Sequence, residues 1–305
     1  MKSFLVNRNM PFLAGTTILA LAREVWQGNM LERETEMSKT RRMSRIFSHD
    51  GKSLTLALDG YYFSSKTVGI DKMINILPKL IENGLDAVIV TYGMAKMHAE
   101  SFADLGLVVR ADLSASVFNP SIPNTTELLS VEDAIKLGAD GVISMTFPGA
   151  DDETESHKIA WNLAKASDHW NVPYMCETLP YSYHVTSPES NQIETIAAAA
   201  RIGTELGADI IKTRLTGEPD DAKIIKAAKR PVLALGGPKT DNILDYFVYV
   251  KHCMDVGAKG VAVGRNIILD ENPIGVVAGL NIIIHKNGTA KEAYMVYQNS
   301  LEIIH

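Results

Sequence analysis

Short apolar runs alternate with longer amphipathic segments from Ser53 to the end of the chain. Apolar runs of this length, bounded by turn residues, are typical of strands that are covered on both faces. They predict strands at residues 53–59, 86–91, 107–112, 141–146, 172–178, 208–213, 231–235 and 260–264. Helices are predicted at residues 71–81, 130–137, 153–170, 191–206, 220–228, 240–256, 273–286 and 290–302. Strands that alternate with helices in this way form a parallel sheet.

A four-residue phrase with a central glycine recurs before every second predicted strand. It occurs as Asn83-Gly-Leu-Asp86, Leu137-Gly-Ala-Asp140, Leu206-Gly-Ala-Asp209 and Val256-Gly-Ala-Lys259. The glycine fits the left-handed position just after a helix, so the phrase predicts a short helix-to-strand loop. Eight strand–helix units with no reversal of strand order favour a closed (β/α)8 TIM barrel. A doubly wound open sheet is disfavoured because no G-x-G-x-x-G motif follows residues 53–59.

Length and composition narrow the class of protein. The chain has 305 residues, which accommodates one barrel of about 250 residues with extensions. Its net charge of −6 argues against a dominant surface for nucleic acids or anionic membranes. No apolar run approaches the roughly 20 residues that a membrane helix needs. The two cysteines, Cys176 and Cys253, cannot form a disulfide framework, so we expect a cytoplasmic protein in a reducing compartment.

Residues 1–47 precede the alternating pattern and are predicted to form a helical extension of a barrel domain at residues 48–305. Residues 11–22 are mildly apolar and favour a helix that packs on the domain or on another subunit over a signal peptide. Residues 41–47 are basic and amphipathic. They fit a cap on the bottom of the barrel, a contact with a neighbouring subunit, or an arm in solvent.

The active site of such a barrel lies at the carboxyl ends of its strands. Lys212 ends the sixth predicted strand, where a partly desolvated lysine can lose its proton and attack a carbonyl. Arg214 follows and would raise the local positive potential, which favours the free amine. Alternatively, the stem of Lys212 packs on the barrel mouth and its ammonium is solvated or paired.

Carboxylates also end predicted strands. Glu177 ends the fifth strand, next to the sixth, where it could move protons during a reaction at Lys212. A structural ion pair is the alternative interpretation of Glu177. Asp59 ends the first strand and could orient the lysine or act as a second acid or base, or it could simply form a turn. Thr91 and Asp112 complete the polar residues at these strand ends.

Glycine-rich stretches follow the last two predicted strands. Gly236 and Gly237 follow the seventh strand, with Lys239 close by, and Gly264 and Arg265 follow the eighth. Phosphate sites of barrels are built from these two loops together with a helix N-terminus. Glycine lets backbone N–H groups approach a phosphate, and an arginine adds a bidentate contact. We therefore expect a phosphate site here, with Lys239 either assisting it or remaining in solvent.

The sequence contains no arrangement that predicts a metal or an organic cofactor. The eight histidines include no H-x-x-x-H or H-E-x-x-H spacing, and no C-x-x-C occurs. We therefore expect a reaction that uses neither.

Several stretches resemble a known family. Gly207-Ala-Asp-Ile-Ile-Lys-Thr213 with Thr216-Gly217 is similar to the Schiff-base strand of the class I aldolases related to deoxyribose-phosphate aldolase. Gly236-Gly-Pro-Lys-Thr240 and Gly257-Ala-Lys-Gly-Val-Ala-Val-Gly-Arg-Asn-Ile267 resemble the phosphate loops of archaeal-type class I fructose-bisphosphate aldolase and of aminodideoxyheptulosonate synthase. Arg42-Met-Ser-Arg-Ile-Phe47 and Tyr62-Phe63 are similar to the autoinducer-2 phosphate thiolase. The resemblance covers roughly residues 41–300.

This resemblance implies roles for individual residues. Lys212 matches the Schiff-base lysine, and Asp59 matches the aspartate of the family's first strand. Glu177 falls where the tagatose-bisphosphate aldolase branch carries a catalytic glutamate. Relatives form rings of subunits, often decamers, so the resemblance also implies a homo-oligomer. The implied phosphate binders are Gly236, Gly237, Gly264 and Arg265.

Two departures from the family pattern leave the substrate and the proton donor open. The family's Asp-His-Gly motif is replaced by Asp-Gly-Tyr, beginning at Asp59. Leu179 stands before a proline where the archaeal-type aldolases have a tyrosine that donates a proton. Tyr181 and Tyr183, in the loop that follows, are other candidates for a phenol donor.

We therefore expect a class I aldolase, a carbon–carbon lyase acting on a phosphorylated ketose of the fructose-bisphosphate type or on a related dicarbonyl. Its catalytic residues would be Lys212, Glu177 and Asp59, with Arg214 contacting the substrate. One alternative is acyl or aldol transfer of the autoinducer-2 phosphate thiolase type, with coenzyme A as acceptor, or of the heptulosonate synthase type. Another is a sugar-phosphate-binding barrel without catalysis, which the altered motifs suggest.

Overall fold

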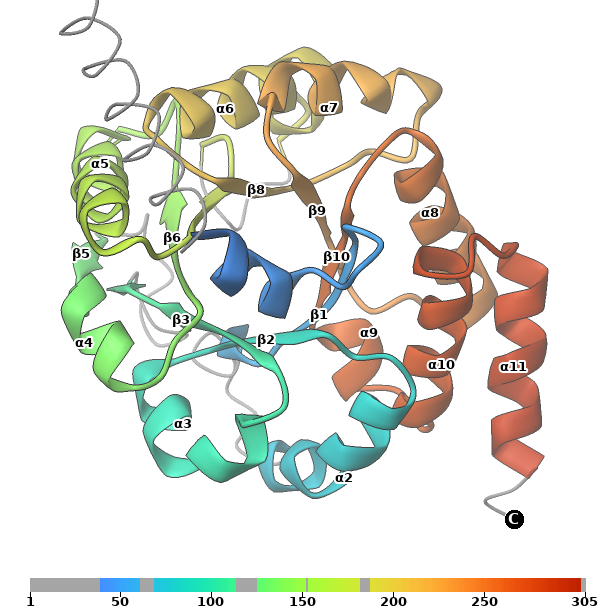
Figure 1. Cartoon of the computed structure of the whole chain (residues 1–305). Helices are drawn as coiled ribbons and strands as arrows, with labels where there is room; N and C mark the ends of the chain where they lie inside the picture. Colours follow the sequence, from blue (N-terminus) through green and yellow to red (C-terminus); the bar gives the residue numbers. More distant parts are fainter. Residues whose placement is uncertain (1–38, 61–68, 114–124, 152, 182–186, 303–305) are drawn as a thin grey trace, which may run out of the picture.

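Eight parallel strands close into a barrel in the computed structural model, which describes residues 39–60, 69–113, 125–151, 153–181 and 187–302 (Figure 1). Around the barrel the order is β1-β10-β9-β8-β7-β6-β3-β2. The strands are β1 (Ser53–Ala57), β2 (Ala87–Val90), β3 (Gly106–Arg110), β6 (Gly141–Thr146), β7 (Tyr174–Thr178), β8 (Ile210–Thr213), β9 (Val232–Leu235) and β10 (Gly260–Val263). The prediction of a (β/α)8 barrel is confirmed.

Helices form a ring around the barrel (Figure 1). The predicted helices are α2 (Ile70–Glu82), α4 (Val131–Lys136), α5 (Glu153–Trp170), α6 (Ile193–Glu205), α7 (Ala222–Ala228), α8 (Ile243–Asp255), α10 (Pro273–Ile284) and α11 (Ala290–Glu302). The predicted elements at residues 107–112, 191–206 and 220–228 overlap the short elements β4 (Asp112–Leu113), η3 (Glu189–Asn191) and η4 (Pro219–Asp221). The sequence pattern does not predict the short elements α3 (Tyr92–Met97), η2 (Ala99–Phe102), β5 (Thr126–Glu127) and α9 (Arg265–Ile268). They are too short for periodicity to be detected. None of the described helices is long and apolar enough to cross a membrane.

Two apolar layers explain why the strands appear in the sequence as continuous apolar runs. Outward-facing side chains such as Leu54 and Val88 pack beneath the helices in the main core. Inward-facing side chains such as Ile89, Ile143 and Leu233 fill the barrel itself. Because both faces of each strand are buried, the alternation between faces does not show as a polar–apolar pattern.

The recurring glycine phrase has the expected backbone geometry. Its glycines have φ values of 99°, 81°, 98° and 107° at Gly84, Gly138, Gly207 and Gly257. In three copies the aspartate has a further role, because it accepts a hydrogen bond from an N–H near the start of the preceding barrel strand. These bonds join Asp86 to Leu54 (2.7 Å), Asp140 to Leu107 (3.0 Å) and Asp209 to Tyr174 (2.9 Å). The phrase therefore ends one helix and also ties two neighbouring strands together.

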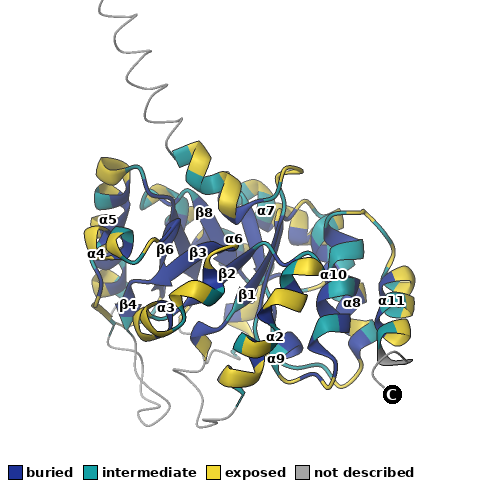
Figure 2. Cartoon of the chain, turned by 60° about the horizontal axis from the view of Figure 1, so that its bottom comes forward, coloured by how far each residue is buried: buried dark blue, intermediate teal, exposed yellow. Residues whose placement is uncertain are grey.

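Residues 39–46 form a helix that closes the amino end of the barrel (Figures 1 and 2). Ile46 at its end is fully buried and belongs to the same apolar cluster as the inward-facing Val108 and Ile143. Gly106, the first residue of β3, allows this close approach, because a Cβ there would lie 2.2 Å from the Arg45 carbonyl oxygen.

Ion pairs fasten this capping helix to the glycine phrases. Lys39 Nζ lies 2.9 Å from Asp209 Oδ2, and Arg45 Nε lies 3.1 Å from Asp140 Oδ2. The basic stretch at residues 41–47 thus caps the bottom of the barrel, which is the first of the three interpretations given above. The helix expected at residues 11–22 lies outside the described residues, and the domain boundary at residue 47 stays a prediction.

Candidate active site

A buried lysine–glutamate pair lies at the carboxyl end of the barrel. Lys212 of β8 is the register partner of Glu177 of β7, two residues beyond the inward-facing Ile210 and Met175. Lys212 Nζ lies 2.9 Å from Glu177 Oε1, and the two residues are only 3% and 4% exposed. The two strand ends therefore bring a carboxylate within hydrogen-bond distance of the amine, inside the barrel.

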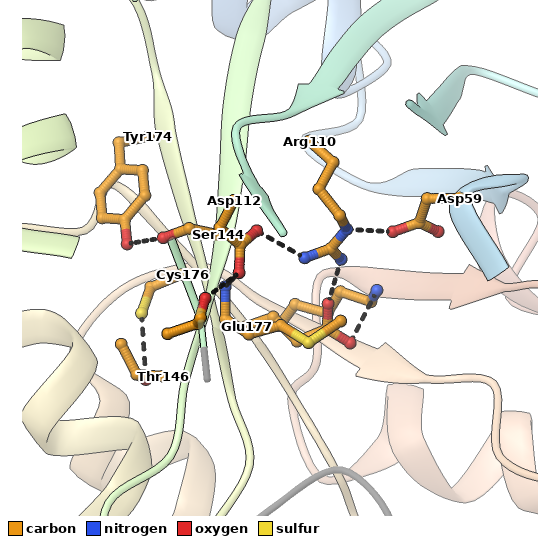
Figure 3. Close-up of polar contacts among 11 residues, drawn as sticks. Asp59, Arg110, Asp112, Ser144, Thr146, Tyr174, Cys176 and Glu177 are labelled. Atoms are coloured by element: carbon orange, nitrogen blue, oxygen red, sulfur yellow. Dashed lines mark hydrogen bonds and ion pairs between the residues drawn. The ribbon is translucent and has the colours of Figure 1, made fainter. Parts of the chain in front are cut away.

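Arg110, the last residue of β3, joins this pair to two further carboxylates (Figure 3). Its Nη2 donates to Glu177 Oε2 at 2.5 Å, and its Nε donates to Asp59 Oδ2 at 2.6 Å. Its Nη1 donates to Asp112 Oδ1 at 3.0 Å. Asp59 therefore lies in the same buried cluster as Lys212 and is joined to it through Arg110.

The sequence did not single out Arg110, because the strand was predicted to run to Asp112 and Arg110 is in fact the last residue of β3. A signal was present in the run Leu107-Val-Val-Arg-Ala-Asp112, where an arginine interrupts apolar residues. The two-residue period of a strand places Arg110 on the face of the buried Val108, which points into the barrel. An inward-facing arginine requires buried carboxylate partners.

Burial and neighbouring opposite charges shift the pKa values of these groups in opposite directions. Burial alone would raise the pKa of Asp59, but the Arg110 and Lys212 charges outweigh it and lower this pKa. Burial raises the pKa of Asp112, and its bonds from Arg110 and from the Met145 N–H offset this only in part. Burial would lower the pKa of Arg110, yet Asp59, Glu177 and Asp112 hold it well above its usual range. The cluster thus contains a permanently charged arginine.

The side of the barrel mouth near β6 and β7 is apolar. Met145, Phe147 and Leu179 form a separate buried cluster, against which Leu235 packs. Leu179 is 5% exposed and lies two residues beyond Glu177, where its side chain has no proton to donate. Tyr181 packs its ring on Gly149, since a Cβ on this glycine would lie 2.7 Å from a ring carbon. Tyr183 lies outside the described residues.

The two predicted phosphate loops lie side by side and are joined by Asn266. Asn266 Nδ2 donates to the carbonyl oxygens of Gly236 and Pro238, both at 2.8 Å, and its Oδ1 accepts from the Thr240 N–H at 2.9 Å. Gly236 must lack a side chain, because a Cβ there would lie 2.9 Å from Val263 Cα. Sequence reasoning missed Asn266 as the link, because its partners are about thirty residues earlier in the chain.

The two basic residues of these loops differ in exposure and in their partners. Arg265 is exposed at the start of α9, directly after Gly264. Lys239 Nζ lies 2.7 Å from Asp270 Oδ2, and Asp270 Oδ1 also accepts from the Tyr297 hydroxyl at 2.9 Å. Lys239 is therefore paired with a carboxylate, and its side chain stays 29% exposed.

Two other predicted positions also have partners. Arg214 is half-buried, and its Nη1 donates to Asn191 Oδ1. Burial lowers the pKa of Arg214. Thr91 caps α3 by accepting a hydrogen bond from the Met94 N–H. Among the described residues, no group of three or more His, Cys, Asp or Glu side chains could hold a metal ion.

A closed parallel barrel with a lysine and acid groups buried at its carboxyl end has the architecture of a (β/α)8 enzyme. The family described as DeoC/LacD family aldolase matches residues 44–270, so the chain belongs to this aldolase family. It is therefore an enzyme of the aldolase class.

Relatives and solved structures agree with this assignment. An uncharacterised aldolase from Saccharolobus solfataricus is 30% identical, over 84% of this chain and 97% of its own. The 2-amino-3,7-dideoxy-D-threo-hept-6-ulosonate synthase 1 of Archaeoglobus fulgidus is 32% identical, over 88% of this chain and 98% of its own. The crystal structure of an archaeal fructose 1,6-bisphosphate aldolase superposes with a TM-score of 0.72 at 28% identity, covering 81% of this chain and 99% of that one. A similar archaeal aldolase structure has its catalytic lysine bound to a carbinolamine intermediate, with the same TM-score and identity.

Proposed function

We propose that this chain is a class I aldolase in which Lys212 forms a Schiff base with a phosphorylated ketone. The observation that carries the proposal is the contact between Lys212 Nζ and Glu177 Oε1 at 2.9 Å in a buried site. A lysine that is withdrawn from water and held beside a carboxylate can transfer its proton to that carboxylate and attack a carbonyl. A barrel that only binds sugar phosphates has no need of this pair, which disfavours the non-catalytic alternative.

The reaction follows from imine chemistry. The free amine of Lys212 adds to the ketone carbon, and loss of one water leaves a protonated imine. A base then removes the proton of the hydroxyl beside the carbon–carbon bond, the bond breaks, and its electron pair moves to the imine nitrogen. The aldehyde departs and leaves an enamine. Protonation of the enamine carbon and addition of water release the ketone and restore Lys212.

Glu177 carries protons in this scheme, with Asp59 as the second acid or base. Glu177 is in contact with the lysine nitrogen, so it can accept the proton of the amine and protonate the departing water. Asp59 belongs to the same cluster because it is paired with Arg110, and the charge of Lys212 helps to lower its pKa. Leu179 offers no proton, so Glu177 takes the place of a tyrosine donor.

The loops after β9 and β10 are proposed to hold the substrate phosphate. The half-buried Gly237 and Gly264 are the proposed sources of backbone N–H groups, and Arg265 is exposed beside them at a helix start. The N–H of Gly236 donates to the Ala262 carbonyl at 2.9 Å, so this residue contributes by shaping the loop. Lys239 lies in the same loop, but its charge is balanced by Asp270, so we assign it a smaller part in phosphate binding than Arg265. We further assign Arg214 to the substrate, since it follows Lys212 by two residues. A phosphate bound at a distance from the reacting carbon positions the ketone for attack.

We propose a ketose of the fructose-bisphosphate type as substrate, on the strength of the archaeal aldolases at 28% identity. Aldol transfer is the second candidate reaction. It is favoured by the 32% identical heptulosonate synthase and by Leu179, which removes the tyrosine of the archaeal-type aldolases. Both candidates share the imine at Lys212.

Release of a phosphorylated aldehyde from fructose 1,6-bisphosphate tests this proposal. Wild-type protein should release the aldehyde, and Lys212→Met should lose the activity because no amine remains. Lys226→Met, which removes an exposed lysine of α7, is the matched control and should keep it. Equal rates for the wild type and Lys212→Met would overturn the imine mechanism. Activity only when a second aldehyde or coenzyme A is supplied would select transfer over cleavage.

We also infer that the enzyme works as a cytoplasmic homo-oligomer. Both cysteines are free and buried, which fits a reducing compartment. Light scattering of the purified protein measures the subunit number, and a monomer would contradict the oligomer.

A further inference from the structure

We propose that Arg110 is a positioning residue of the active site, which holds Glu177 with one oxygen turned to Lys212. This inference rests on the proposed function, because Glu177 is the proton carrier there. Arg110 comes from β3, which is separated from the β8 strand of Lys212 by β7 and β6, and its role is separate from those of the substrate-contacting residues.

The geometry of Arg110 explains how one side chain can organise the site. Its Nε, Nη1 and Nη2 each donate to a carboxylate, and these carboxylates belong to Asp59, Asp112 and Glu177. The three acids come from separate parts of the chain, after β1, in β4 and in β7. A planar guanidinium can hold three partners in fixed directions, whereas a lysine ammonium is a single point charge. Each of its three nitrogens donates to an acid, so we assign Arg110 the role of holding these acids in place.

The two oxygens of Glu177 have different partners. Oε2 accepts from Arg110 at 2.5 Å, and Oε1 accepts from Lys212 at 2.9 Å. Arg110 therefore fixes the rotation of the carboxylate and leaves the other oxygen for the lysine and for the proton transfers. Without Arg110, the Glu177 carboxylate is free to rotate away from Lys212, and Asp59 and Asp112 can compete with it for the Lys212 ammonium.

The charges around the pair make this arrangement depend on Arg110. The charged groups facing Glu177 are Arg110, Lys212, Asp59 and Asp112, and each is at most 6% exposed. Cys176 is adjacent, but burial raises the pKa of its thiol to about 11, so it stays neutral at working pH. If Arg110 is removed, Lys212 is the cation that remains beside the three carboxylates in the described part of the cluster. A carboxylate that loses a neighbouring cation takes up a proton at higher pH.

The pH dependence of kcat/KM is the readout that separates positioning from simple structural support. Arg110→Met removes the charge, so the acidic limb of the profile should move to higher pH by about one unit or more. The limb moves upward because the carboxylate needed as base is protonated over a wider range. Arg110→Lys keeps a charge but loses the three-way fork. It should restore the limb while kcat stays reduced, by up to about 100-fold, because the carboxylate is misplaced.

Three further variants control for loss of folding and for unspecific effects. Arg110→Met with Asp112→Asn removes one charge of each sign, so the net charge of the cluster is unchanged, and Asp112→Asn alone is its reference. The double variant should still show a displaced limb relative to this reference. Arg45→Met removes an arginine that pairs with Asp140 at the opposite end of the barrel, and its profile should match the wild type.

The possible outcomes are distinct. Borohydride trapping with dihydroxyacetone phosphate reports the imine in each variant. If the wild type forms no imine, the proposed function fails and this inference fails with it. If the wild type forms an imine and Arg110→Met and the double variant keep unchanged acidic limbs, the inference about Arg110 alone is overturned. A displaced limb in both, rescued by Arg110→Lys, supports it.

Discussion

Both ends of the barrel carry ion pairs, but the pairs lie at the rim of the amino end and in the interior of the carboxyl end. At the amino end the pairs lie at the rim, where the Arg45 side chain is 47% exposed, and the barrel interior beneath them is filled by Ile46 and other apolar side chains. At the carboxyl end the interior itself is charged, and the side chains of Arg110, Glu177 and Lys212 are at most 6% exposed. Along β3, β7 and β8 this change takes only two residues.

Neighbouring strands show how abrupt this change is. Met175 and Ile210 are inward-facing register partners in the apolar layer, and the next inward positions are Glu177 and Lys212. An apolar layer contributes to stability through burial. A buried charged layer contributes little net stability but can lower the barrier of a reaction. We therefore expect mutations at the carboxyl end to affect turnover and mutations at the amino end to affect folding.

The largest expected effect is on turnover at the carboxyl end. Glu177→Gln removes the proton carrier but keeps the shape of the side chain. We expect kcat to fall by about 10²- to 10⁴-fold, the usual contribution of general acid–base catalysis. Binding of inorganic phosphate should remain largely intact, because the phosphate loops follow β9 and β10. Steady-state kinetics and calorimetry measure the two effects. Glu155→Gln on the exposed face of α5 is the control, and an unchanged rate in Glu177→Gln would remove this residue from the mechanism.

The next effect is on stability at the amino end. Ile46→Ala truncates the fully buried side chain that closes the barrel and should lower the free energy of unfolding by about 2–4 kcal/mol. The kcat of the folded fraction should change little, because Ile46 lies at the far end from Lys212. Urea unfolding followed by circular dichroism gives the stability. Arg41→Ala, at an exposed position of the same helix, should be near neutral. A loss of kcat without a loss of stability would contradict the division between the two ends.

The smallest expected effect is on the pH dependence of stability, through a histidine at the amino end. His285 lies 3.0 Å from both Asp50 Oδ2 and Asp86 Oδ2, and the nearby Lys52 donates to the Ile284 carbonyl. Burial would lower the pKa of His285, but the bonds and charges of the two aspartates outweigh it and raise this pKa. A raised folded-state pKa gives stability that is fully present below the unfolded pKa and is lost as pH rises through the folded one.

A stability profile between acidic and alkaline pH checks this sign. Wild-type protein should lose part of its unfolding free energy as pH rises through the neutral range, on the order of 1 kcal/mol. His285→Gln should lack this component, so the difference between the two proteins should shrink toward high pH. His169→Gln on α5 is a control that should keep the wild-type slope. A difference that grows with pH would show that the neutral form of His285 is the stabilising one.

How far the sequence predicts this molecule depends on how local each feature is. The strands, most helices and the glycine phrases were predictable because each depends on the pattern within a short segment. Lys212 and Glu177 were also predictable, since the barrel rule places the ends of successive strands together. Arg110 was not predicted, because the pattern placed the end of its strand at Asp112, two residues beyond the true end of β3.

Long-range pairings limited the prediction for the phosphate loops. Lys239 is held by Asp270, which is in turn bonded by Tyr297 of the terminal helix α11. Nothing in the sequence around Lys239 indicates this contact, because its partners are tens of residues away. In the same way, the glycine phrase predicts a helix end but not the bond from Asp140 to the Leu107 N–H. Such contacts are set by the closed barrel and not by local sequence.

The central claim is that Lys212 forms a covalent imine with a phosphorylated ketone. Its most direct test is the mass of the peptides obtained after borohydride treatment in the presence of dihydroxyacetone phosphate. We predict a stable adduct on the peptide that contains Lys212 in the wild type, and no adduct on the corresponding peptide of Lys212→Met. An adduct confined to another lysine, or no adduct in wild-type protein that is shown to be folded, would contradict the account.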